Sequence, residues 1–187
     1  IGGVRLIASG LCGLMKENVM DGIANSPAAR DKAFLVHPMT NLKKHLDIGP
    51  TIISRGKGVR VYDDAGREYI EGMAGLWCTS LGYGEERLVQ AAANQMRKLP
   101  YVQQFRHMSH DPGIDLAEKL IGIAPEGITK AFFVNSGSEA NDTIVKFVRF
   151  YHNAIGKPAK KKIIARQKGY HGTTLVAASL SGLPHMH

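Results

Sequence analysis

The sequence Ala-Phe-Phe-Val-Asn-Ser-Gly-Ser-Glu-Ala-Asn-Asp, which runs from Ala131 to Asp142, decides the fold class of this chain. Its first four residues are apolar, as in a buried strand, and a helical pattern follows from about Ser138 to Asn153. A Gly/Ser loop between a strand and a helix presents free N–H groups and the positive end of the helix dipole to an anion. Gly137 has no Cβ, so a ligand can approach the backbone closely. The hydroxyls of Ser136 and Ser138 can add hydrogen bonds, and we predict a phosphate-binding loop.

A plainer interpretation of the same residues is a capping box. Ser136 and Glu139 have the spacing of an N-cap residue and its N3 partner, and Asp142 would then be an ordinary acidic residue near the helix start. This loop alone leaves both interpretations open.

A second loop favours ligand binding. Residues 161–166 have the apolar centre of another buried strand, and the loop that follows carries Tyr170, His171 and Gly172. In an open α/β sheet, the loops at the carboxyl ends of neighbouring strands converge on one crevice. An exposed aromatic ring there can stack on a flat ligand ring whose phosphate lies in the first loop. A ring with a phosphate suggests pyridoxal 5'-phosphate.

These motifs, taken in order, resemble the N-terminal part of a class-III pyridoxal-phosphate-dependent aminotransferase, the group that contains the omega-amino acid and amine:pyruvate transaminases. The match covers most of the chain, and several motifs in the family's order make chance similarity very improbable. The matching segments are His37–Thr40, Gly75–Cys78, Phe132–Asp142, Gly169–Gly172 and Ala178–Gly182.

The resemblance implies an α/β fold, the fold type I of pyridoxal-phosphate-dependent transferases. Residues 15–75 would form the N-terminal arm and hairpin segment of the small domain. Residues 76–187 would form the first half of the large domain, which is built on a parallel sheet and binds the cofactor. Residues 1–14 are expected to be a leader or an added segment, with Met15 or Met20 as the natural start.

The resemblance also implies roles for individual residues. The predicted cofactor-binding residues are Ser136, Gly137, Ser138, Tyr170 and His171. The predicted substrate pocket contains Met39, Trp77 and Phe105, the last reaching the active site from a partner subunit. Instead of contacting a ligand, Tyr170 and Trp77 could pack in the core, and His171 could be an ordinary loop residue. Met39 departs from the family, which often has an aromatic residue there, so the preferred amine is open.

Family members use a lysine that holds the cofactor as a Schiff base and an Asp beside the pyridine nitrogen. Both are expected beyond His187, and Lys168 matches only a variable basic position, so no catalytic residue is assigned. The implied activity moves an amino group from an amine or omega-amino acid to a keto acid such as pyruvate, in a homodimer. An aminomutase, a decarboxylase or a non-catalytic truncated remnant are the alternatives, and the 187-residue chain alone is expected to be inactive.

Local patterns predict the remaining elements. A hairpin is expected around Asp63–Gly66, and helices are expected at 85–99, 111–121 and 173–180, the second capped by Ser109 or Asp111. An extended arm with a short helix is expected over residues 21–50.

Composition limits the function. The net charge of +8 could suggest nucleic acid, but the basic residues are scattered and no recognised module accompanies them, so neither nucleic acid nor membrane is an expected partner. Cys12 and Cys78 form no CxxC pair, which favours a cytoplasmic location. His107, His110 and Asp111 resemble a metal-binding set, but Pro112 favours a capped loop and no metal is expected.

Overall fold

The computed structural model describes residues 25–187, so the predicted leader, Cys12 and the two candidate start residues lie outside the described residues. The described residues divide into two compact units, 25–101 and 102–187, each of which is described by itself. The predicted domain boundary between residues 75 and 76 stays a prediction.

The described part of the first unit starts with two short helices, α2 (Pro27–Phe34) and α3 (Leu42–Ile48). The hydroxyl of Ser26 caps α2 by accepting a 3.2 Å hydrogen bond from the N–H of Ala29. Asn41 caps α3 in the same way, with 3.0 Å to the N–H of Lys44. These polar side chains satisfy amides that a helix start leaves without partners. Over its described residues, 25–50, the arm therefore contains two helices, whereas one was predicted.

An antiparallel sheet follows, in the order β1 (Ile53–Lys57), β2 (Arg60–Asp63) and β3 (Glu68–Ile70). Strands β2 and β3 pair with Val61 opposite Tyr69, which confirms the predicted hairpin. Val61 is buried in this unit. Helix α4 (Ala74–Trp77) comes next, and α5 (Glu86–Lys98) stops before Pro100, as predicted.

Asp63 organises the hairpin turn. Its buried carboxylate accepts hydrogen bonds from the N–H of Ala65 (3.0 Å), the N–H and Nε of Arg67 (2.8 and 2.7 Å) and the hydroxyl of Tyr69 (2.9 Å). Burial raises the pKa of Asp63, but the hydrogen bonds from Arg67 and Tyr69 lower it by more, so this pKa lies below its ordinary value. The carboxylate is therefore charged at neutral pH and holds the turn together.

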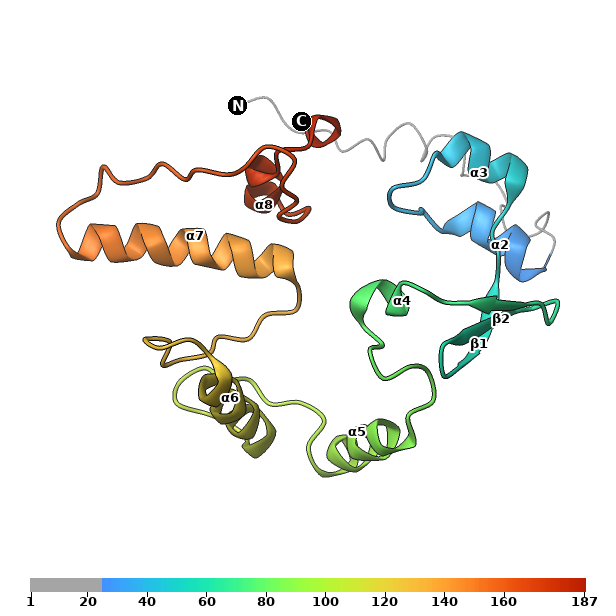
Figure 1. Ribbon diagram of the computed structural model, residues 1–187, viewed down its shortest axis with the longest axis horizontal. Helices are drawn as coiled ribbons and strands as arrows, with labels where there is room; N and C mark the ends of the chain where they lie inside the picture. Colours follow the sequence, from blue (N-terminus) through green and yellow to red (C-terminus); the bar gives the residue numbers. More distant parts are fainter. Residues whose placement is uncertain (1–24) are drawn as a thin grey trace, which may run out of the picture. The chain divides into compact units, whose positions relative to one another are not determined.

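The second unit contains α6 (Asp111–Ile123), α7 (Gly137–Ala154), α8 (Leu175–Leu180) and a 3₁₀ turn at Pro184–Met186. Figure 1 shows α8 beside the part of α7 that begins the helix, and the two helices are in contact. Val145 and Ala177, one from each helix, are the buried apolar residues of this unit within the described chain.

Two predictions for this unit are wrong. Residues 130–134 and 161–166 form no strand in the described structure, and Phe132 and Ile164 are exposed rather than buried on both faces. A strand requires a neighbour about 4.8 Å away that accepts and donates its backbone hydrogen bonds, and neither segment has one among the described residues. The predicted parallel sheet is reduced to one isolated parallel bridge between Gln167 and Gly182.

The predicted cap of α6 is also wrong. His110 is the N-cap, and its Nδ1 accepts a 3.2 Å hydrogen bond from the N–H of Gly113, while Asp111 is already the first helical residue. Histidine is an uncommon cap, and the usual preference for Ser or Asp pointed to the wrong neighbours.

Candidate functional site: the start of helix α7

The first turn of α7 is held by a side-chain cap. The hydroxyl of Ser136 accepts a 3.1 Å hydrogen bond from the N–H of Glu139. The Glu139 carboxylate reaches back to accept from the N–H of Asn135 at 2.9 Å and from its side-chain amide at 3.2 Å. A capping arrangement is therefore present, with Glu139 bonding Asn135 one residue before the cap. This arrangement fixes the shape of the loop.

The cap leaves part of the helix start available. The N–H groups of Gly137 and Ser138 form no hydrogen bond with any described residue. Open space surrounds Gly137, because a Cβ built there would meet no atom within 4 Å. Free amides at the positive end of an 18-residue helix are a suitable site for an anion. Capping and anion binding, which were opposed as interpretations of the sequence, use different groups of the same turn.

The loop that carries Tyr170 and His171 is attached to this turn. The Asn141 side-chain amide donates a 2.6 Å hydrogen bond to the carbonyl of His171, and the N–H of Thr173 donates to the Ser138 hydroxyl at 3.0 Å. Gly172 is buried between them with φ +126°. A Cβ on Gly172 would come within 2.8 Å of the Ser138 Cα, so only glycine allows this approach.

Asp142 joins α7 to α8. One oxygen of its carboxylate accepts from the hydroxyl of Thr174 at 2.8 Å and from the N–H of Ala177 at 3.0 Å. Thr174 is the N-cap residue of α8, yet its own side chain caps nothing, so Asp142 performs this task from another helix. The sequence analysis treated Asp142 as an ordinary acidic residue, and nothing local in the sequence signals its distant partners.

Residues near the end of the unit contact the loop that carries Tyr170 and His171. The buried hydroxyl of Ser181 accepts a 2.9 Å hydrogen bond from the N–H of His171. Two backbone hydrogen bonds of 2.8 Å join Gly182 to Lys168 and to Gly169. The segment Ala178–Gly182, which entered the sequence analysis only as a matching motif, thus supports the loop from behind.

Tyr170 and His171 differ in their surroundings. The Tyr170 side chain is 62% exposed, so it is not a core residue and its ring is free to contact a ligand. The His171 ring is partly buried and lies against Gly169, where its Nε2 would be 3.1 Å from a Cβ built on that glycine. All five predicted cofactor-binding residues therefore belong to two loops that hydrogen bonds join, although their contact with a cofactor stays a prediction.

The predicted pocket residues are highly exposed. Met39 and Trp77 belong to the first unit and Phe105 to the second, with exposed fractions of 89%, 88% and 78%. Their grouping around a substrate stays a prediction.

An unusual backbone supports a functional role for the turn that carries Trp77. Four successive residues, Ala74–Trp77, have positive φ values between 48° and 67°. For residues other than glycine this conformation costs about 1–2 kcal/mol each. The Glu71 carboxylate holds the turn by accepting from the N–H groups of Met73 (3.0 Å) and Gly75 (2.7 Å). Such backbone conformations concentrate at functional sites.

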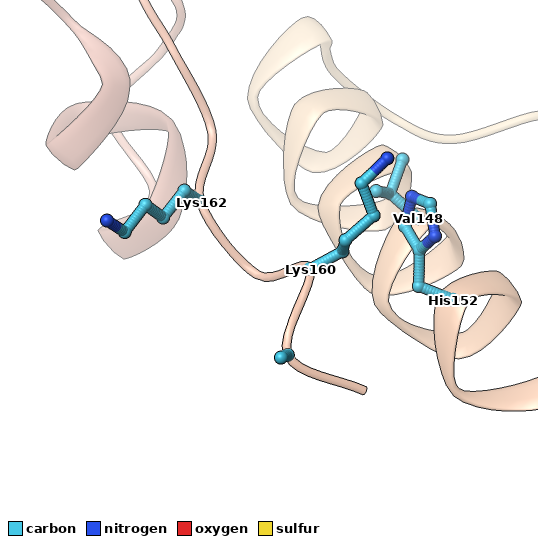
Figure 2. A pocket seen from close by; sticks show the side chains of 5 residues that line it. Val148, His152, Lys160 and Lys162 are labelled. Atoms are coloured by element: carbon cyan, nitrogen blue, oxygen red, sulfur yellow. The ribbon is translucent and has the colours of Figure 1, made fainter. Parts of the chain in front are cut away.

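A separate hollow lies farther along α7. It is lined by Val148, His152, Ala159, Lys160 and Lys162. Figure 2 shows Lys160 extending beside Val148 and His152, whereas Lys162 points away. Val148 lies about 15 Å beyond Ser138 along the helix, given a rise of about 1.5 Å per residue. The hollow therefore lies apart from the candidate phosphate site.

His110, one of the two histidines considered as metal ligands, plays another role. The Nδ1 of His110 is engaged as the cap of α6, and no metal-binding set forms around it among the described residues. The set with suitable geometry is Asp31, His37 and His45, which the sequence analysis missed because its members are 6 and 8 residues apart. Among the described residues, no helix has the length and apolar character to cross a bilayer.

Comparison with known proteins identifies the family. The model for aminotransferase class-III matches residues 43–187. Gamma aminobutyrate transaminase 1, mitochondrial, of Solanum lycopersicum is 50% identical over 154 residues, which cover 82% of this chain and 30% of that protein. A probable gamma-aminobutyrate transaminase 2, mitochondrial, of Oryza sativa subsp. indica is 51% identical over the same length and is covered to 31%.

Solved structures agree. The omega transaminase from Pseudomonas jessenii in complex with PMP has a TM-score of 0.85 and 54% identity, covering 87% of this chain and 36% of that chain. A structure titled as a transaminase with L-ala has a TM-score of 0.80 and 50% identity, with 87% and 36% covered. The chain belongs to the class-III aminotransferase family. It spans about 30% of the length of the curated relatives it matches.

Proposed function

We propose that this chain provides the phosphate-binding part of a pyridoxal-phosphate-dependent transaminase that moves an amino group from an amine or omega-amino acid to a keto acid such as pyruvate. The observation that carries the proposal is the start of α7. There the amides of Gly137 and Ser138 have no hydrogen-bond partner among the described residues, and Gly137 adjoins open space beside a loop that presents an exposed Tyr170. The names of the relatives, gamma-aminobutyrate and omega transaminases, support the substrate class.

The residues present fit a phosphate group. The Ser138 hydroxyl already accepts a hydrogen bond from Thr173, which leaves its own hydrogen free to donate. The hydroxyl of Ser136 is in the same position, because it accepts from Glu139. Two amides and two hydroxyls can therefore donate to phosphate oxygens, and the helix dipole adds to the attraction.

Other residues of the chain would orient the reactants. The exposed ring of Tyr170 would stack on the cofactor ring, and His171 would stand beside it. Trp77 and Met39 would line the substrate pocket around the apolar part of the amine, and Phe105 would reach the pocket of a partner subunit. The chemistry supplied by bound pyridoxal phosphate is the delocalisation of electrons left on the substrate carbon.

The phosphate site is tested by titrating the chain with pyridoxal phosphate and with pyridoxal, and by following ³¹P resonances and ring absorbance. We expect pyridoxal phosphate to bind and pyridoxal to bind at least tenfold more weakly. The substitution Gly137→Asp adds a negative charge where the phosphate would lie. It should weaken the binding of pyridoxal phosphate at least about tenfold through charge repulsion.

Gly122→Asp is the matched control, since Gly122 also faces open space but lies in α6. Equal binding of the two ligands, or an unchanged affinity in Gly137→Asp, would contradict the proposed site.

The reaction is tested with the whole protein that contains this chain. The donor is 4-aminobutyrate, the acceptor is pyruvate, and the measured product is alanine. Release of carbon dioxide without alanine would instead indicate a decarboxylase, and the transaminase proposal would fail.

A cytoplasmic location and a homodimer remain further proposals. Free and exposed Cys78 is compatible with a reducing compartment. Cell fractionation tests the location, and size-exclusion chromatography with light scattering tests the oligomeric state.

A further inference from the structure

Three potential metal ligands converge in the first unit, outside the proposed cofactor site. The Nε2 of His37 lies 3.0 Å from both carboxylate oxygens of Asp31, and the Nε2 of His45 lies 2.8 Å from one of them. One ligating atom from each residue lies within 4.8 Å of the other two. We call these three residues the His–Asp–His cluster.

Rigid elements hold the cluster. Asp31 belongs to α2 and His45 to α3, two helices with side-chain caps, and His37 lies in the short link between them. The Nζ of Lys32 donates a 2.6 Å hydrogen bond to the carbonyl of Leu46, which joins the two helices next to the cluster. The His37 and His45 rings are in contact, with 4.3 Å between their centroids and a tilt of 41° between their planes. Ligands placed on connected helices need little reorganisation to bind an ion.

The chemistry of the cluster suits a cation. The Asp31 carboxylate lies within hydrogen-bonding distance of the Nε2 atoms of both His37 and His45. An ionised carboxylate only accepts hydrogen bonds, so each Nε2 that faces it must carry a hydrogen. When a divalent cation binds, the hydrogen of each neutral ring moves to Nδ1, and the freed Nε2 lone pairs of His37 and His45 join the Asp31 carboxylate as ligands.

The distances agree with a tetrahedral ion. Zinc–ligand bonds of about 2.0–2.1 Å place tetrahedral ligand atoms about 3.3 Å apart. The separations of 3.0 and 2.8 Å from the Asp31 carboxylate to the Nε2 atoms of His37 and His45 need to widen by only a few tenths of an ångström, and the ligating atoms of the two histidines lie within 4.8 Å of each other. His37 is the more exposed of the histidines, at 28% against 11% for His45, so its side of the cluster is open for entry of the ion and for a water molecule as fourth ligand.

We propose that Asp31, His37 and His45 bind a borderline transition-metal ion, Zn²⁺ by preference, which joins α2 to α3 in the N-terminal arm. Two imidazoles and one carboxylate suit zinc, whereas Mg²⁺ and Ca²⁺ prefer oxygen ligands throughout. This site goes beyond the proposed transaminase function and does not depend on it. The ion is structural, and its binding free energy stabilises the arm.

Isothermal titration of the full chain with ZnCl₂ and with MgCl₂, near pH 7.5, tests the proposal. We expect one Zn²⁺ per chain and no heat from Mg²⁺. His45→Ala and Asp31→Asn should each weaken Zn²⁺ binding at least about 100-fold, since each removes a ligand.

His185→Ala is the matched control, because His185 is exposed and lies in the other unit. It should bind Zn²⁺ as the unchanged chain does. An absence of binding, or equal affinity in His45→Ala and the unchanged chain, overturns the proposal.

A measurement on the unchanged chain does not depend on how the variants fold. X-ray absorption at the zinc edge, with one equivalent of Zn²⁺, should show two imidazole rings and no sulfur in the first shell. Sulfur scattering would mean that a cysteine holds the ion and would overturn the site. Circular dichroism at about 222 nm should show α2 and α3 melting at a higher temperature with Zn²⁺ than after chelation with EDTA.

Discussion

The hairpin region, residues 60–75, and helix α7 contain carboxylates with contrasting partners. In the hairpin region, Asp63 and Glu71 bond backbone and side-chain groups no more than six residues away. In α7, Asp142 bonds Thr174 and Ala177, which are 32 and 35 residues away. Local contacts can form as soon as the turn forms, whereas distant ones must first overcome the entropy of closing a long loop. The comparison teaches that the candidate phosphate site depends on non-local contacts and the hairpin does not.

The largest expected effect comes from filling the space between α7 and the Tyr170 loop. Gly172→Ala should destabilise the second unit by roughly 3 kcal/mol, because the new Cβ meets the Ser138 backbone and φ is positive. Urea unfolding followed by circular dichroism measures this loss. Gly127→Ala is the control: its φ is also positive, but its surroundings are open. Equal losses in the two variants would show that the close approach does not matter.

Removing the distant carboxylate should have the next largest effect. Asp142→Ala leaves the Thr174 hydroxyl and the Ala177 N–H without their acceptor and should cost about 2 kcal/mol. Asp142→Asn keeps an acceptor oxygen and should lose less than half as much. Hydrogen exchange of the Ala177 amide reports the contact directly. Unchanged protection in Asp142→Ala would refute the importance of this contact.

A substitution in the strained turn before Cys78 should increase stability, by less than the two preceding substitutions decrease it. Leu76→Gly should stabilise the first unit by about 1 kcal/mol, because Leu76 has φ 61°, is exposed, and glycine adopts this conformation without strain. Thermal unfolding measures the gain. Leu88→Gly, at an exposed position inside α5, should instead destabilise the chain by about 1 kcal/mol. Destabilisation by Leu76→Gly would show that the left-handed turn is not strained.

The smallest expected effect is on the stability of the hairpin at low pH. Near neutral pH, the contribution of Asp63 to the free energy of unfolding should not change with pH. The pKa of Asp63 is lowered on folding, so its stabilising contribution is present above the unfolded value of about 3.8 and is lost as the pH falls through the lower folded value. The stability difference between the unchanged chain and Asp63→Asn should therefore be constant from about pH 5 to pH 7. It should shrink below about pH 3.8. Hydrogen exchange of the Arg67 amide as a function of pH measures how strongly the Asp63 carboxylate stabilises the hairpin. Loss of protection well above pH 4 would contradict the lowered pKa of Asp63.

Much of the local structure could be predicted from the sequence. The hairpin around Asp63–Gly66 and the helix ending before Pro100 were correct, because turn residues, caps and apolar periodicity act within a few residues. The phosphate-loop motif located the start of α7 to within one residue. The histidine cap of α6 was missed, since propensity alone favours its neighbours.

The two predicted strands failed for a different reason. Residues 130–134 and 161–166 are as apolar as a buried strand requires, but a strand also needs a hydrogen-bonding neighbour, and apolar composition does not supply one. The Phe132 ring packs against Phe147 of α7 with 5.4 Å between centroids, so this segment contacts a helix without joining a sheet.

By itself, the sequence determined the family, the helices α5 to α8, the hairpin and the two loops that carry the predicted cofactor-binding residues. Only the tertiary structure decided that Asp142 caps α8, that Gly172 lies against Ser138, and that Asp31, His37 and His45 meet. The physical reason is sequence separation. Caps and turns depend on neighbours along the chain, which the sequence displays, whereas these contacts join residues that only the folded backbone brings together.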